Sequence, residues 1–96
     1  MKKYEIVFIV RPNLEAENIK KVVTDFSNLL EKNKAKVTLN KELGKKDLAY
    51  EIKNYKSGYY FLFQVESEDH KAIKEFDRLA LINEDIIRHL IIRIDE

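Results

Sequence analysis

Two stretches with helical apolar periodicity alternate with strand-like stretches, and this order limits the possible folds most strongly. Apolar side chains recur every three or four residues within residues 14–32, and again within residues 67–82. Residues rich in aromatic and β-branched side chains precede, separate and follow these helices. The expected strands are residues 4–10, 36–43, 48–52, 59–65 and 86–94.

If residues 36–52 form one strand, the order is strand, helix, strand, strand, helix, strand. This is the split βαβ, or ferredoxin-like, arrangement of the α+β class. Right-handed crossovers place both helices on one face of a four-stranded antiparallel sheet, with strand order four-one-three-two. The other face stays open, and we expect partners to dock there. All of residues 1–96 are expected to form a single domain, since the chain is too short for two cores.

Local breaks in the pattern predict three details of the backbone. Gly44 interrupts the alternation of residues 36–52, which predicts either one long strand with a bulge or two short strands. The segment Asn54–Gly58 is expected to form the hairpin turn before the third strand. Asn13, just after Pro12, is placed to cap the first helix.

Composition gives no direct sign of nucleic-acid binding. Lys and Arg total 18 against 17 Asp and Glu, for a net charge of +1, so RNA affinity would require local basic patches. The absence of cysteine excludes disulfides, thiolate metal sites and a cysteine nucleophile. No stretch is long enough to span a membrane and no secretory signal is visible, so the expected compartment is the cytoplasm.

Residues suited to catalysis are few and scattered. His70 is expected in the first turn of the second helix, and His89 lies within the last strand with no matching acidic spacing. Arg11 and Asn13 suggest a phosphate site of an acylphosphatase-like hydrolase, but a glycine-rich phosphate loop is missing. We therefore expect a non-enzymatic protein with no metal and no cofactor.

Aromatic residues crowd the expected third strand. Strict alternation places Tyr59, Phe61 and Phe63 on one face and Tyr60 on the other. RNA-recognition-motif domains stack bases on aromatics of the equivalent strand. Their consensus fits poorly here, because Ser57 stands where a basic residue is expected, so core packing is the favoured interpretation.

Basic residues form candidate patches on this fold. Lys45 and Lys46 follow the bend at Gly44, and Lys53 flanks the hairpin. The first and last strands are neighbours in the expected sheet, so their basic residues are expected to lie close together. These residues are Lys2, Lys3, Arg88 and Arg93.

Several segments, in order and over the whole length, resemble the bacterial small-subunit ribosomal protein six family. The segments are Tyr4-Glu5 with Ile9-Val10, Arg11-Pro12-Asn13-Leu14, Leu43-Gly44-Lys45-Lys46, Leu48-Ala49-Tyr50-Glu51-Ile52, Gly58-Tyr59-Tyr60 and Asp85-Ile86-Ile87-Arg88-His89. The resemblance implies a ferredoxin-like protein of the small ribosomal subunit. It further implies binding to the central domain of 16S rRNA jointly with ribosomal protein eighteen.

Matched by position, the resemblance also implies where RNA binds. The implied RNA-binding residues are Lys2, Lys3, Lys45, Lys46, Lys53, Arg88 and Arg93, and Tyr4 and Tyr50 are implied to face RNA or the partner. We add Val7 and Ile9 from the open sheet face. Asp47 departs from the family, and a carboxylate there would repel phosphate.

A second functional class stays open at this point. Ferredoxin-like domains commonly associate through the open sheet face, so the alternative is a homodimeric protein-interaction or ligand-sensing module. The ribosomal interpretation instead expects a chain that is monomeric when free.

Overall fold

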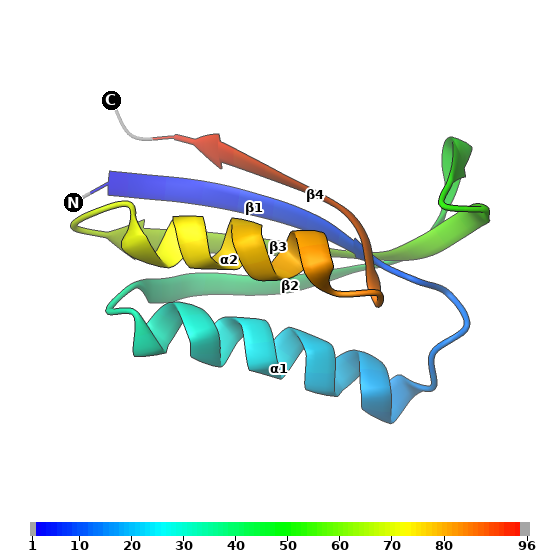
Figure 1. Ribbon diagram of the computed structural model, residues 1–96, viewed down its shortest axis with the longest axis horizontal. Helices are drawn as coiled ribbons and strands as arrows, with labels where there is room; N and C mark the ends of the chain where they lie inside the picture. Colours follow the sequence, from blue (N-terminus) through cyan, green and yellow to red (C-terminus); the bar gives the residue numbers. More distant parts are fainter. Residues whose placement is uncertain (1, 95–96) are drawn as a thin grey trace.

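A computed structural model describes residues 2–94, which form six elements around one core (Figure 1). In chain order these are β1 (Lys2–Val10), α1 (Ala16–Lys32), β2 (Lys36–Ile52), β3 (Tyr55–Ser67), α2 (Lys71–Ile82) and β4 (Ile86–Arg93). No helix within residues 2–94 is long and apolar enough to cross a membrane.

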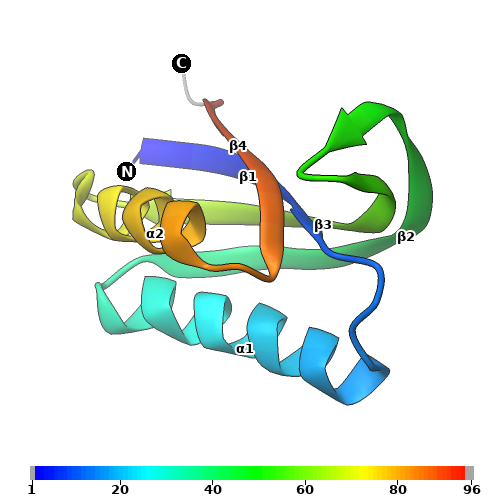
Figure 2. The same ribbon diagram turned by 45° about the vertical axis from the view of Figure 1, so that its right-hand side comes forward.

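The four strands form one antiparallel sheet in the order β2-β3-β1-β4. Both helices lie on the same side of that sheet (Figures 1 and 2). The ferredoxin-like prediction and its strand order are therefore confirmed. Each helix connects two strands through a crossover, and the right-handed twist of strands brings both crossovers to one face.

The core lies between the helices and one face of the sheet, and Phe8 is at its centre. Its ring contacts four other aromatic rings, with centroid distances of 5.1 Å to Phe63, 5.4 Å to Phe61, 5.9 Å to Phe76 and 6.4 Å to Phe26. These rings come from β1, β3 and both helices, so one cluster joins the two layers. Full burial of such a ring contributes roughly 1.5–3 kcal/mol each.

The helices begin later than the periodicity predicts. α1 starts at Ala16, and its N-cap is Glu15 rather than Asn13. The Asn13 amide oxygen instead accepts a hydrogen bond of 2.9 Å from Nη1 of Arg11, so the predicted cap is wrong. α2 starts at Lys71, because β3 continues as far as Ser67.

β2 is one long strand with a bulge at Gly44. The pairing with β3 shifts register between Glu42 and Gly44, and Gly44 has a φ of +90°. Glycine adopts that backbone conformation without the Cβ clash that other residues meet. The bulge alternative is thus confirmed, and the alternative of two short strands is wrong.

The hairpin turn between β2 and β3 differs from the prediction. It consists of two residues, Lys53 and Asn54, with φ of 52° and 70°. Two consecutive positive φ values are typical of the type I′ turn, which matches the twist of the flanking strands. The predicted turn at Asn54–Gly58 is wrong, because Gly58 lies within β3 and is buried there.

Gly58 is required by close packing rather than by a turn. A Cβ at this position would overlap Cγ2 of Ile9 and lie 3.0 Å from the carbonyl oxygen of Val10. We predict that Gly58→Ala lowers the free energy of unfolding by about 1–3 kcal/mol, because β1 and β3 must separate to admit the methyl group. Urea denaturation monitored by circular dichroism measures this.

The matched control is Ser57→Ala, a neighbouring change at a half-buried position. It should alter the free energy of unfolding by about 0.5 kcal/mol or less. Equal destabilisation by both substitutions would contradict the proposed overlap.

Candidate functional site

Strand pairing divides the sheet into a helix-covered face and an open face. Directly paired residues share a face. On β1, the side chains of Val7 and Ile9 point to the open face, and their β4 partners are Leu90 and Arg88. The open face therefore carries apolar residues at its middle, as expected for Val7 and Ile9, and the cation Arg88 lies beside them.

The tip of the β2–β3 hairpin bends over this open face. Figure 2 shows the tip curling away from the helices. Nη1 of Arg88 donates a hydrogen bond of 2.8 Å to the hydroxyl oxygen of Tyr50. Since β2 and β4 are opposite edges of the sheet, this bond spans the intervening strands β3 and β1. The resemblance implied that Tyr50 and Arg88 lie on the same side of the molecule, and the structure brings them into contact.

A groove of about 360 Å³ lies between the hairpin tip and the sheet. Most of its lining side chains are apolar or aromatic: Val7, Ile9, Leu48, Ala49, Tyr50, Ile52, Tyr60 and Leu90, with Arg88 and His89. The tip and its neighbours leave Ile9 only 7% exposed. Ile9 thus faces the predicted side but presents little surface to a partner.

Two apolar residues that the sequence analysis did not select extend this surface along β4. Leu90 is 56% exposed and Ile92 is 43% exposed. Both lie on the open face, opposite Val7 and Glu5. The sequence did contain a signal for this surface. Apolar residues of the segment 86–94 fall on both faces of the expected strand, and the predicted strand order places that strand at an edge of the sheet.

The two lysines after Gly44 point to opposite faces. Lys46 lies on the open face, with its Nζ 5.7 Å from the centre of the Tyr60 ring. Lys45 is paired with Tyr59, whose side chain packs against the core, so Lys45 lies on the helix side. Asp47 is two residues from Lys45 and shares its side, which directs the carboxylate away from Lys46.

Lys53 lies in the hairpin turn, whereas Lys2, Lys3 and Arg93 lie at the far end of the sheet from it. Nζ of Lys3 lies 4.0 Å from Oε1 of Glu66, and the backbone oxygen of Lys3 accepts a hydrogen bond from the amide of Ile94. Arg93 pairs with Tyr4 and lies about 16 Å along β4 from Arg88, at roughly 3.3 Å per residue. The expected proximity of Arg88 to this group is therefore wrong.

Tyr4 does not face RNA or a partner, and that prediction is corrected. Its side chain is only 4% exposed because it lies on the same alternating set as Ile6 and Phe8. Its hydroxyl lies 2.5 Å from Nδ1 of His70, and Nζ of Lys2 lies 3.0 Å from Nε2. A lysine ammonium can only donate, so Nε2 accepts and Nδ1 carries the proton that His70 donates to Tyr4.

The residues that suggested a hydrolase have structural partners. Nε of Arg11 donates a 2.7 Å hydrogen bond to Asp85, which joins the end of β1 to the start of β4. This hydrogen bond raises the pKa of Arg11 above its usual value. Nε2 of His89 lies 2.7 Å from Oδ1 of Asp77 on α2. These contacts fasten helices and loops to the sheet.

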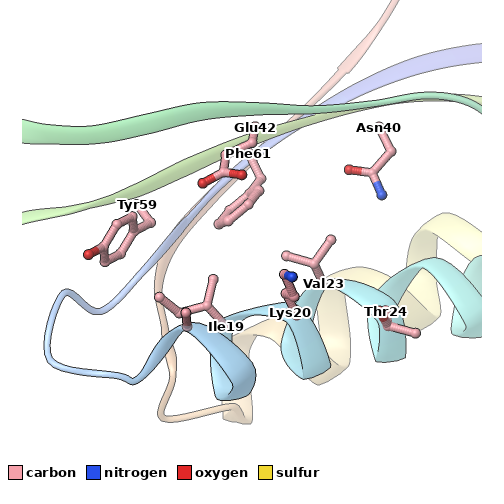
Figure 3. Close-up of a pocket in the computed structure, with 9 residues that line it drawn as sticks. Ile19, Lys20, Val23, Thr24, Asn40, Glu42, Tyr59 and Phe61 are labelled. Carbon is pink, nitrogen blue, oxygen red and sulfur yellow. The ribbon is translucent and has the colours of Figure 1, made fainter.

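A second hollow, of about 470 Å³, lies on the helix side between α1 and the strands β2 and β3 (Figure 3). Buried apolar side chains from both layers, those of Ile19, Val23 and Phe61, line its inner part. Polar side chains surround them: Lys20, Thr24, Asn40, Glu42 and Tyr59. Lys45, opposite Tyr59 on β2, is next to this cleft along the sheet.

The sequence matches the family model of ribosomal protein S6 over residues 3–93. The chain belongs to the ribosomal protein S6 family. The crystal structure of the 30S ribosomal protein S6 from Thermotoga maritima is similar to it with a TM-score of 0.91 and 26% sequence identity, covering 97% of this chain and 87% of that one.

An Arabidopsis thaliana protein shares the fold alone. It matches with a TM-score of 0.59 and 16% identity, covering 100% of this chain and 95% of that one.

Members of the ribosomal protein S6 family are structural, rRNA-binding components of the small subunit and are not enzymes. The expected family and the non-enzymatic character are confirmed.

In this member of the ribosomal protein S6 family, the Tyr50 hydroxyl is predicted to hold the hairpin tip over the groove. Tyr50→Phe should accelerate amide hydrogen exchange in residues 48–52 by roughly three- to ten-fold, because the bond to Arg88 contributes about 0.5–1.5 kcal/mol. Global stability should change little, since the tip lies outside the core.

Hydrogen exchange measured by NMR tests this, with Tyr59→Phe as the control at a tyrosine outside the tip. Unchanged exchange in residues 48–52 of the Tyr50→Phe protein would show that the hydroxyl does not fasten the tip.

Proposed function

We propose that this protein binds the central domain of 16S rRNA jointly with ribosomal protein eighteen, in the ribosome of the bacterial cytoplasm. The observation that carries the proposal is the open sheet face: an apolar groove under the hairpin tip, continued by Leu90 and Ile92 and flanked by Lys46 and Arg88. Apolar surface of this kind suits a protein partner. Cations beside it suit phosphate.

The two partners would divide this surface. The groove and the exposed side chains of Leu90 and Ile92 are assigned to ribosomal protein eighteen, because rRNA offers them little apolar surface. Lys46, Lys53 and Arg88 are assigned to phosphates of the rRNA, since they lie at the hairpin or on the open face. The predicted contacts at Lys2, Lys3 and Arg93 form a separate group at the other end of the sheet.

The charge of the chain supports joint rather than independent binding. A net charge of +1 gives weak long-range attraction to RNA. A basic partner docked on the apolar face would add positive charge next to Lys46 and Arg88. The pair should then bind the rRNA fragment more tightly than either protein alone, and the free chain should be monomeric.

The exposed apolar face also favours a second candidate function, that of a protein-interaction or ligand-sensing module that forms a homodimer through the same surface. Sedimentation equilibrium at micromolar concentration separates the two. A single species of 11.4 kDa supports the ribosomal proposal, and a stable species of twice that mass supports the homodimer.

Substitution of Leu90 tests the partner surface. We predict that Leu90→Asp weakens the complex with ribosomal protein eighteen and the rRNA fragment by at least about ten-fold, because it places a charge in an apolar contact. Leu81→Asp is the matched control, since Leu81 is 66% exposed on α2, away from the groove. Isothermal titration calorimetry measures the affinity of both variants. Equal affinities would argue against the open face as the surface that binds the partner protein.

Substitution of the hairpin lysines tests the phosphate contacts. Lys46→Ala combined with Lys53→Ala should reduce the slope of log affinity against log salt by about 1.4–1.8, at roughly 0.7–0.9 per phosphate contact. Lys32→Ala with Lys34→Ala is the control, and Lys34 has a positive φ as Lys53 does. The proposal predicts that the control double variant keeps the slope of the unaltered protein. If the two double variants have the same slope, the hairpin lysines do not contact phosphate.

A further inference from the structure

The cleft between α1 and the β2–β3 edge has features of a nucleotide site. We propose that it binds an unstacked guanine nucleotide, with the base between helix and sheet and the phosphate at Lys45. The inference deepens the proposed function where the base comes from RNA, but the cleft can be tested with the nucleotide alone. Its volume of about 470 Å³ falls within the range of roughly 300–1,000 Å³ typical of small-molecule sites.

The inner part of the cleft suits a flat apolar body. Figure 3 shows Tyr59 and Phe61 extending from the sheet towards Ile19 and Val23 of α1. Phe61 is buried, whereas Tyr59 is only half-buried and keeps part of its side chain towards the cleft. Unpaired bases are commonly bound by stacking on such aromatic side chains. The aliphatic side chains of α1 would cover the opposite face of the base.

The polar side chains favour guanine over the other bases. Glu42 extends from the sheet into the cleft beside Phe61 (Figure 3). An ionised carboxylate only accepts hydrogen bonds, and its two oxygens can accept two at once. Guanine is the base whose Watson–Crick edge carries two adjacent donors, the N1–H and the N2 amino group. Asn40 lies next along β2, placed to bind the neighbouring guanine O6 through its amide NH₂.

The charges of the cleft fit a nucleotide rather than a free base. Lys45 shares the helix-side face of β2 with Glu42 and pairs with Tyr59, so it lies at the edge of the cleft, beside the residues that line it. Lys20 enters from α1 on the opposite wall (Figure 3). Within residues 2–94, no ion pair joins Lys20, Glu42 or Lys45 to another side chain. These charges can therefore engage a ligand without breaking an existing pair.

The first experiment titrates the full chain with guanosine 5′-monophosphate while recording amide and side-chain NMR shifts. The expected result is saturable shifts at cleft residues, with an affinity about ten-fold higher than for the adenosine, cytidine and uridine monophosphates, as expected for one bidentate pair. Equal shifts with all four nucleotides, shifts confined to the open face, or no shifts would each overturn the proposal.

Variants separate the base contact from the phosphate contact. Glu42→Gln should remove most of the preference for guanine, because the amide presents a donor where the base needs an acceptor, and Glu31→Gln on α1 is the control. Lys45→Ala should weaken the binding of guanosine monophosphate by about three-fold or more and leave the binding of guanosine, which has no phosphate, unchanged. Its control is Lys41→Ala, on the other face of the same strand. A guanine preference that survives Glu42→Gln would overturn the assignment of the base edge.

A last comparison identifies the source of the nucleotide and separates this inference from the proposed function. A short single-stranded oligoribonucleotide with one guanine should bind the cleft more tightly than the mononucleotide if RNA supplies the base. Equal affinity supports a free guanine nucleotide. If guanine binds the cleft but the chain and ribosomal protein eighteen do not bind the rRNA fragment, the proposed function fails and the cleft assignment stands.

Discussion

The packing of the Phe8 ring is the interaction on which the rest of the structure depends. Phe8 lies on the second strand from one edge, β1, which pairs with both β3 and β4. Its ring meets aromatic side chains from the neighbouring strand and from both helices. Because strand side chains alternate, fixing Phe8 in the core also fixes Val7 and Ile9 on the open face. The core and the candidate interface are thus opposite sides of one strand.

The element order and the core could be predicted because they follow from periodicity alone. The alternation along β1 would also have placed Tyr4 with Ile6 and Phe8 in the core, and the resemblance to a family led away from that simpler inference. The type I′ turn was missed because lysine seldom adopts a positive φ, as Lys53 does here, whereas a glycine such as Gly58 is typical of turns. Its actual role, contact with Ile9 and Val10, depends on a strand far away in the sequence.

The candidate site was only partly predictable for a geometric reason. Lys45 and Lys46 read as one basic pair, but adjacent strand residues point to opposite faces, so they contribute to different surfaces. The contact between Tyr50 and Arg88 requires a curl of the hairpin that no local pattern specifies. Leu90 and Ile92 were visible as apolar residues, but only the folded chain shows that both are exposed on the open face.

The pairing of β1 with β4 has a consequence for the order in which the protein can mature during synthesis. The β2–β3 hairpin is local in sequence and β1 can pair with β3 once β3 is made, whereas the pairing of β1 with β4 must wait for the last strand. Until then Val7 has no Leu90 beside it, and the Tyr50 hydroxyl does not yet accept the hydrogen bond from Arg88. The β4 side of the open face, with Leu90 and Arg88, is therefore completed last, when synthesis has reached the end of β4.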